Sequence, residues 1–335
     1  MGWVIFLYSF IYKTLAPIRA ERKVQHMYET SNVGKYQPVV IGIDHGFSLI
    51  KSYHHIMSNG VARTSGKPPV LENSLYYNGN YYVIGGSRMT VNEDKTENDN
   101  YFILTLGAIA KELKTRGIEK FAKVVLGVGV PFKRFGEEQA NLVNYLTRSG
   151  LIVYEFEGQE LTIVIQKVIC YPQCFAAIAD RISNMEGRYV VADIGSWTKD
   201  IVCIDNKRIN VEQSVTISHS IITLFQSMNS AIYAKTGKRI PEDILQDFIL
   251  GKEVILPFEV KEIIKRQLME FAHKTEGQLN EYGFDIDYSN IIYVGGGATI
   301  MRRFGSDRAN VSYLEDVRLN ARGYELLAKS QLNRS

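Results

Sequence analysis

The stretch VVIGIDHGFSLIK at residues 39–51 decides the fold, and its pattern returns as YVVADIGSWTKDIVCID at residues 189–205. Each copy opens with a short apolar run, which predicts a buried strand. The run ends in Asp-x-Gly, which is typical of a tight turn, and a second β-type run follows. Two copies of one strand–turn–strand unit predict an internal duplication, with the boundary between the halves near residue 185.

Strand and helix patterns alternate along the rest of the chain. Helical spacing is found at 101–115, 137–148, 173–182, 218–235, 241–250, 257–282 and 320–332. Further β-type runs lie at 48–55, 123–130, 207–215 and 291–294, and Asn78-Gly79-Asn80 between tyrosine-rich runs predicts a hairpin. A chain of 335 residues with this alternation predicts an α/β protein built around two cores.

Composition and charge exclude several classes of protein. Hydrophobic residues make up 45% of the chain and charged residues 22%, which excludes a wholly disordered or collagen-like protein. The net charge of +3 is too weak to predict direct binding of nucleic acid, which needs a concentrated basic face. Cys170, Cys174 and Cys203 are odd in number and lack the spacing of a zinc site. We therefore expect a reducing, cytoplasmic setting.

The first 37 residues differ from the rest. Residues 2–12 form an apolar run that is too short to span a membrane, which takes roughly 20 residues, and no basic residue precedes it as in a secretory signal. Basic residues follow at 19–23, so a helix lying on a membrane surface is one interpretation. We favour a tail outside the folded core, or a start at Met27, and expect the folded chain to begin near Pro38.

The two Asp-x-Gly turns carry groups that suit a metal-bound polyphosphate. Asp44 and Asp193 each stand at the end of a strand, and Mg²⁺ favours one or two carboxylates together with water and phosphate. The glycine of each turn lets backbone N–H groups face an anion. The hydroxyls of Ser48, Ser196 and Thr198 can donate to phosphate oxygens. Such loops on opposite domains predict a site that grips a polyphosphate between them.

Each of these motifs also has a plainer interpretation. A single Asp-x-Gly is typical of an ordinary hairpin turn, and the matched contexts of the pair are what favour phosphate binding. Gly295-Gly296-Gly297 after a strand lets a backbone approach a nucleotide closely, or simply connects a strand to a helix. The chain contains neither GxxxxGK[ST] nor GxGxxG, so the P-loop and Rossmann interpretations lose their main support.

The order of Asp-x-Gly, a second Asp-x-Gly and Gly-Gly-Gly resembles the ATPase fold shared by actin, the large heat-shock chaperones and the sugar kinases. The segment IGIDHGFSLIK is similar to the opening of plasmid-segregation actins of the ParM/StbA type, which often carry a lysine matching Lys51. Segments 124–138, 171–177 and 320–329 are similar to further parts of that family. The resemblance covers about residues 38–332.

The resemblance implies an α/β fold of two ribonuclease-H-like (actin-type) domains with a nucleotide cleft between them. The domains would span residues 38–184 and 185–335, behind the tail of residues 1–37, and the C-terminal helix would return toward the first domain. ATP and Mg²⁺ are the implied cofactors, and GTP remains an alternative to ATP.

The resemblance also implies roles for single residues. Asp44 and Asp193 would organise Mg²⁺, largely through water, and Gln173 would orient the attacking water. An amide suits positioning better than proton abstraction, and many segregation actins have a glutamate at this place. Trp197 is bulkier than the residue expected there and is predicted to point into the cleft. The implied nucleotide contacts are Gly46, Phe47, Ser48, Lys51, Gly195, Ser196, Trp197, Thr198, Gly295, Gly296 and Gly297.

On this resemblance, ATP closes the two domains and hydrolysis relaxes them, which reorients the surfaces facing the next subunit. A head-to-tail contact that does not close into a ring makes a filament. We therefore expect ATP-dependent polymerisation that drives plasmid segregation through a small DNA-binding adaptor protein. The alternatives are a small-molecule kinase of the same fold, for which Gln173 is a poor general base, a heat-shock-type chaperone, and a membrane-associated cell-shape or division actin.

Overall fold

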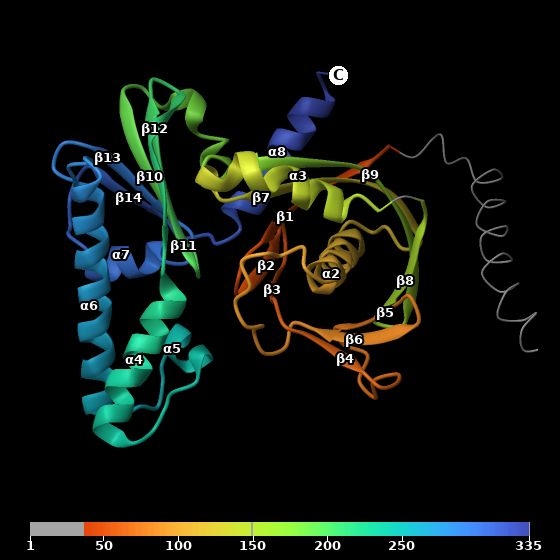
Figure 1. Cartoon of the computed structure of the whole chain (residues 1–335), viewed down its shortest axis with the longest axis horizontal. Coiled ribbons are helices and arrows are strands. Elements are labelled where there is room, and N and C mark those ends of the chain that lie inside the picture. The colour runs from red at the N-terminus through yellow and green to blue at the C-terminus, as the bar shows by residue number, and fades with distance from the viewer. Residues whose placement is uncertain (1–36, 149, 335) are drawn as a thin grey trace, which may run out of the picture.

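The computed structural model describes residues 37–148 and 150–334. The apolar run at 2–12, the basic residues at 19–23 and the alternative start at Met27 lie outside the described residues. Within the described part, every helix is too short or too polar to cross a lipid bilayer. The strands of this part form one sheet of nine and one of five, each covered by helices (Figure 1).

The nine-stranded sheet builds the first domain. In spatial order its strands are β3 (Ile56–Ser58), β2 (Leu49–Ser52), β1 (Val39–His45), β7 (Phe121–Val130), β9 (Gln159–Pro172), β8 (Ile152–Phe156), β5 (Ser74–Tyr77), β6 (Asn80–Ile84) and β4 (Val61–Thr64). β1 runs antiparallel to β2 and parallel to β7, which is parallel to β9. The predicted hairpin at Asn78 is present, because β5 and β6 pair across it.

The five-stranded sheet builds the second domain and repeats part of the first. Its strands are β12 (Arg208–Ser218), β11 (Thr198–Asp205), β10 (Arg188–Ile194), β13 (Asn290–Val294) and β14 (Val311–Leu314). β10 runs antiparallel to β11 and parallel to β13, which is parallel to β14. This order and these directions match those of β3-β2-β1-β7-β9, so the predicted internal duplication is confirmed in the sheets.

Helices α2 (Asn100–Thr115) and α3 (Phe135–Leu146) cover one face of the first sheet, and α2 lies inside the curve of that sheet (Figure 1). α2 is apolar on most sides because it is enclosed there, with Phe102, Leu104 and Ile109 fully buried. Full burial of each such side chain stabilises the fold by roughly 1.5–3 kcal/mol. The helix stops before Gly117, whose φ of 71° lies in the left-handed region.

Four helices gather on one face of the second sheet: α4 (Ile221–Thr236), α5 (Glu242–Ile249), α6 (Phe258–Glu281) and α7 (Ala298–Phe304) (Figure 1). α6 packs against α4 and α7, with Leu268 and Ala272 fully buried in that contact layer. These helices and the sheet form a hydrophobic core separate from that of the first domain.

The C-terminal helix α8 (Leu319–Leu332) lies directly on strands β1 and β7 of the first domain. Two glycines permit this close approach. A Cβ on Gly42 would lie 1.9 Å from the carbonyl oxygen of Ala321, and one on Gly127 would lie 2.6 Å from that of Tyr324. Any larger residue at either position would lift the helix from the sheet.

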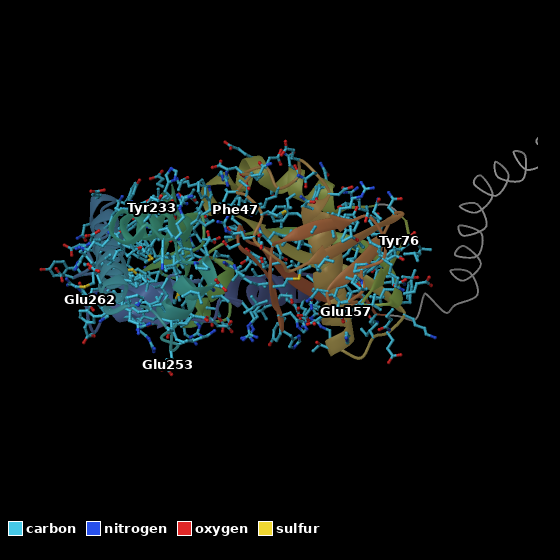
Figure 2. The ribbon with its side chains drawn as sticks, turned by 90° about the horizontal axis from the view of Figure 1, so that it is seen from below. Phe47, Tyr76, Glu157, Tyr233, Glu253 and Glu262 are labelled. Carbon is cyan, nitrogen blue, oxygen red and sulfur yellow. The ribbon has the colours of Figure 1, made fainter. Side chains whose placement is uncertain are left out.

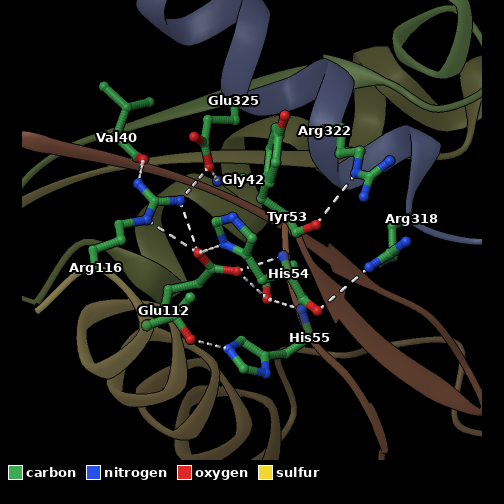
Figure 3. Close-up of polar contacts among 12 residues, drawn as sticks. Val40, Gly42, Tyr53, His54, His55, Glu112, Arg116, Arg318, Arg322 and Glu325 are labelled. Carbon is green, nitrogen blue, oxygen red and sulfur yellow. Dashed lines mark hydrogen bonds and ion pairs between the residues drawn. The ribbon is translucent and has the colours of Figure 1, made fainter.

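A polar network fixes α8 to α2 and β1 (Figure 3). Arg116 donates to Glu112 and to Glu325 at 2.8 Å each, and to the carbonyl oxygen of Val40 at 2.7 Å. Burial alone would raise the pKa of Glu112, but hydrogen bonds from His54 and Ser52 and the nearby Arg116 lower it to about 2. The Glu112 carboxylate therefore stays charged, and its ion pair with Arg116 lies largely shielded from water.

The segment at 173–182 is not the helix that its spacing predicts. It forms two short 3₁₀ turns, at Ala176–Ile178 and Ile182–Asn184. Cys174 has a φ of 68°, which interrupts any helix there, and its backbone N–H donates to Asn320 Oδ1 at 3.1 Å. The apolar residues of the segment pack against the second sheet instead, on the face opposite to α6. The predicted strand at 48–55 is shorter than expected, because β2 covers only Leu49–Ser52 and the next strand, β3, begins beyond that range at Ile56.

Candidate functional site

A cavity of about 710 Å³ lies between the two domains. The β1–β2 hairpin lines it from the first domain and the β10–β11 hairpin lines it from the second. Asp44 and Asp193 are 2% and 7% exposed, and both carboxylates belong to its wall. Figure 2 shows Phe47 at the middle of the elongated molecule, between the two domains. The two Asp-x-Gly turns therefore open into one crevice.

The two turns have the same backbone geometry. The N–H of Gly46 donates to the carbonyl oxygen of Leu49 at 3.0 Å, and that of Gly195 to Thr198 at 2.9 Å. The residues opposite the aspartates differ in charge, however, because Asp44 faces Lys51 across its hairpin. Asp193 faces another aspartate, Asp200.

Asp44 is held by an ammonium and an amide. Lys51 Nζ donates to its Oδ2 at 2.8 Å, and Gln173 Nε2 donates to its Oδ1 at 3.2 Å. Burial would lower the pKa of Lys51, but the Asp44 carboxylate outweighs this and raises it above its usual value. Gln173 is brought to this place by the end of β9, where its N–H donates to the carbonyl oxygen of Val130 at 2.9 Å. Lys51 is thus a charged group on the cavity wall.

Asp193 has an amide partner but no ion pair among the described residues. Asn320 Nδ2 at the start of α8 donates to its Oδ2 at 2.6 Å. Burial raises the pKa of Asp193 to about 6, and the nearby Asp44 carboxylate adds to this increase. Burial also raises the pKa of Asp200 to about 7, with a further contribution from Asp193. The second domain therefore presents carboxylates that would be stabilised by a cation.

The donor set fits Mg²⁺ bound together with phosphate. In residues 37–148 and 150–334, no group of three or more His, Cys, Asp or Glu is placed to hold a metal with protein ligands alone. Mg²⁺ usually keeps several waters and takes one or two carboxylates plus phosphate oxygens. Asp44 and Asp193 would hold such an ion, and it would neutralise phosphate charge between the two domains.

The structure brings most of the sequence-predicted contacts to this cavity. Its wall includes Gly46, Phe47, Ser48, Lys51, Gln173, Gly195, Ser196, Trp197, Thr198, Gly295 and Gly296. Gly295 has a φ of 78°, and a Cβ there would lie 2.3 Å from Asp193 Oδ1, so this position requires glycine. Gly297 does not line the cavity. Its N–H donates to the carbonyl oxygen of Ile194 at 2.9 Å, so it packs the start of α7 against β10.

Trp197 reaches from the second domain to the first. Its indole N–H donates to Glu93 Oε1 at 3.1 Å, and its ring centroid lies 6.4 Å from that of Phe47. The prediction that it points into the cleft therefore agrees with its place in the structure. Its ring therefore lies beside that of Phe47 from the opposite turn.

Several cavity residues have no counterpart among the predicted contacts. The second domain adds a wall from α4, α5 and α7, whose apolar part includes Ile221, Phe225, Ile249 and Ile300 and whose polar part includes Glu242, Asp243 and Gln246. Such a wall suits the base and sugar of a nucleotide. The first domain adds Arg88 and Lys95 from the loop before α2. No sequence motif surrounds Arg88 or Lys95, and only the fold places them in the same cavity as Asp44 and Asp193.

Two family models match the two domains of this chain. The model for the N-terminal domain of actin-like proteins matches residues 42–175. The model for the C-terminal domain of MreB-like archaeal actin homologues matches residues 191–304. The chain belongs to the actin-like proteins. Each matched range contains one of the Asp-x-Gly turns, and the predicted actin-type fold is confirmed.

Solved structures of other actin-like proteins share this fold. The archaeal actin homologue Ta0583 is 20% identical, with a TM-score of 0.70 over 88% of this chain and 99% of its own. ParM of Bacillus thuringiensis, solved with AMPPNP, is 15% identical, with a TM-score of 0.67 over 88% and 99%. A 15-stranded ParM filament from Clostridium botulinum is 16% identical, with a TM-score of 0.71 over 88% and 99%. Among curated proteins, none matches the sequence.

Proposed function

We propose that this actin-like protein binds ATP with Mg²⁺ in the cavity between its domains and hydrolyses it. The observation that carries the proposal is the opening of Asp44 and Asp193 into one cavity from two duplicated hairpins. Complexes of related folds support it, since Ta0583 was solved with ADP and B. thuringiensis ParM with ATP. GTP remains the alternative nucleotide.

In the proposed site, the phosphates lie between the two hairpins. The Lys51 ammonium and the hydroxyls of Ser48 and Ser196 supply donors to the phosphate oxygens. The nucleoside lies against Gly296 and the apolar wall of the second domain. Gln173 gives its amide N–H to Asp44, which leaves its carbonyl oxygen to accept from the attacking water. This orients the water without removing its proton.

We further propose that the protein polymerises head to tail and that hydrolysis in the filament triggers disassembly. The structures of the Alp12 filament and the C. botulinum ParM filament support assembly as a use of this fold. The proposed task is plasmid segregation through a small DNA-binding adaptor. An adaptor is needed because the net charge of +3 offers little attraction to DNA.

Sedimentation tests the filament. The purified protein is spun with Mg-ATP, with Mg-ADP and without nucleotide over a wide range of concentrations, while phosphate release is followed in parallel. We expect pelleting with Mg-ATP that reverses as phosphate is released, and little pelleting with Mg-ADP. Phosphate release without assembly at any concentration would contradict the filament. Phosphate release that depends on an added sugar or acid would favour the small-molecule kinase.

Gln173→Ala tests the role of the amide. We expect phosphate release to slow by about tenfold to a hundredfold, because positioning of the water is lost while the phosphate donors remain. Binding of ATP and pelleting should be largely unchanged. Gln159→Ala at the exposed start of the same strand is the control and should behave as wild type. Loss of ATP binding in Gln173→Ala would show that this residue belongs to the binding site instead.

A further inference from the structure

Residues 85–99, here called the cleft loop, join β6 to α2 and reach across to the second domain. Arg88 forms a two-pronged ion pair with Glu242 at the start of α5, with distances of 2.7 and 3.0 Å. Glu93 accepts the indole N–H of Trp197. Both partners belong to the second domain, so the cleft loop spans the cavity.

Lys95 of this loop lines the cavity with an unpaired charge. Its ammonium lies 4.3 Å from the ring centroid of Phe47 and 5.9 Å from that of Tyr101. Among the residues that the structure describes, no carboxylate lies within ion-pair distance of it. The other two cations of the cavity wall are already paired, Lys51 with Asp44 and Arg88 with Glu242.

The backbone at Lys95 is set by its neighbours. Asp94 Oδ1 accepts the N–H of Thr96 at 2.8 Å and its hydroxyl at 2.6 Å, and Asn92 Oδ1 accepts the N–H of Asp94 at 3.0 Å. These bonds hold the loop in a turn whose central residue is Lys95. The side chain is therefore presented to the cavity by a preset backbone, which lowers the entropic cost of binding a ligand.

Placing the unpaired ammonium of Lys95 at this position costs free energy, because it loses part of its hydration. Burial lowers the pKa of Lys95 to about 8, although the Asp44 carboxylate acts in the opposite direction. The group is still protonated at neutral pH, and a cation–π contact with Phe47 compensates only part of its lost hydration. An anion beside it would restore the missing charge partner and favour the protonated form.

We propose that Lys95 binds the terminal phosphate of a nucleoside triphosphate, opposite Lys51. The inference rests on the proposed nucleotide site and adds to it a specificity for triphosphate over monophosphate. Lys51 is largely neutralised by Asp44, so Lys95 is the cation of the wall whose charge is free for the ligand. Lys95 belongs to the cleft loop, which is bonded to the second domain through Arg88 and Glu93. Its contact with the last phosphate would therefore connect that phosphate to the second domain as well.

Binding measurements with Lys95→Met test this role. The non-hydrolysable analogues of ATP and GTP, ADP and AMP are titrated in the presence of Mg²⁺. We expect Lys95→Met to bind both triphosphates about tenfold to a hundredfold more weakly, the loss typical of one charge-assisted contact. ADP and AMP should both bind as to wild type, because neither carries the terminal phosphate of a triphosphate. Methionine keeps the unbranched side chain as far as Cε and removes the ammonium together with its cation–π contact to Phe47.

Two further variants separate charge from structure. Lys95→Arg retains the positive charge and should keep triphosphate affinity within about threefold of wild type. Lys120→Met makes the same substitution at an exposed lysine of the same domain and should have no effect. Lys95→Met with wild-type affinity for triphosphate, or with equal losses for triphosphate and AMP, overturns the proposal. Wild-type protein that binds no nucleotide overturns the proposed function itself, and this inference with it.

Discussion

The two hairpins that face each other across the cavity share one backbone and differ in charge. In the first, Asp44 is paired with Lys51 and accepts from Gln173. In the second, Asp193 faces Asp200 and accepts only from Asn320 among the described side chains. One duplicated unit has thus become a neutral hairpin and an acidic one.

This difference assigns separate tasks to the two domains. In the proposed site, the first domain would bring cations for phosphate, Lys51 on its strand and Lys95 on the cleft loop. The second domain brings carboxylates whose pKa values are raised chiefly by burial, so a cation beside them would favour their charged form. A magnesium–nucleotide complex carries both kinds of charge, so it would satisfy the two sides at once and draw them together.

The largest effect is expected from removing the acidic carboxylate that faces the cavity. Asp193→Ala should reduce phosphate release by at least about a hundredfold, because the group proposed to organise the metal is lost. Folding should be retained, since burial already disfavours the charge of Asp193. Phosphate release is measured beside Asp180→Ala, an exposed control. Turnover close to that of wild type would remove Asp193 from the site.

The second effect is expected from removing the cation of the first hairpin. Lys51→Met leaves the buried Asp44 without its ion pair, so we expect the free energy of unfolding to fall by about 3 kcal/mol. Triphosphate affinity should fall by less than in Lys95→Met, because Asp44 already neutralises much of the charge of Lys51. Urea unfolding and nucleotide titration measure the two losses, with Lys120→Met as control. Unchanged stability would mean that the Asp44–Lys51 pair contributes little.

The third effect concerns the acidic hairpin in the absence of nucleotide. The pKa of Asp200 is raised to about 7 from an unfolded value near 3.8, so the folded state binds the extra proton between these values. The contribution of Asp200 to the free energy of unfolding is therefore fully present below about pH 4 and is lost as the pH rises through 7. Asp200→Asn should therefore gain stability relative to wild type by about 2 kcal/mol more at pH 8 than at pH 5.

Urea unfolding at the two pH values checks this difference. Asp205→Asn, on the same strand but with its side chain 41% exposed, is the control and should show no such change with pH. An Asp200→Asn variant whose gain is the same at both pH values would show that Asp200 is ionised without penalty.

The smallest effect is a loss of stability as the pH falls, the opposite pH dependence to that of Asp200, and it comes from the first hairpin. Thr105 gives its hydroxyl proton to the carbonyl oxygen of Tyr101, so His45 Nε2–H donates to Thr105 and Nδ1 has no partner. Burial lowers the pKa of His45 to about 3 from 6.5. The unfolded state therefore binds the extra proton in this window, and stability falls as the pH drops below 6.5.

His45→Gln should reduce this acid sensitivity. Between pH 6.5 and 5.5 we expect the loss of unfolding free energy to be smaller than in wild type by roughly 1 kcal/mol, the scale set by one proton. The measurement is urea unfolding at both pH values, with His273→Gln on the exposed side of α6 as control. The second hairpin has Ile194 at the equivalent place and carries no such dependence. Equal losses in wild type and His45→Gln would contradict the assignment.

The features that could be predicted from sequence are those that a short segment determines. The apolar run, the Asp-x-Gly turn and the returning strand of each hairpin are local, and their repetition revealed the duplication. The need for glycine at Gly295 was visible as well, although its reason, the closeness of Asp193, was not. Asp200 stood within a quoted motif, yet its importance depends on the strand register that places it opposite Asp193.

What could not be predicted depends on contacts between distant segments. Arg88 meets Glu242 because the cleft loop reaches the second domain, and Lys95 meets Phe47 because the same loop packs on the β1–β2 turn of its own domain. The predicted helix at 173–182 failed for a similar reason. Its apolar residues are spaced as in a helix, but they are used to pack a turn under the second sheet, where Asn320 fixes the backbone of Cys174.

Asn320 also has a consequence for how the protein is made. It stands at the start of α8, it holds Asp193, and the helix that follows lies on the first domain. On a translating ribosome both hairpins emerge long before this residue does. A nascent or truncated chain that ends before position 320 therefore has both hairpins, but it lacks the helix and the hydrogen bond that connect the second hairpin to the first domain. We therefore expect such a product to hold its two hairpins less rigidly than the complete chain does.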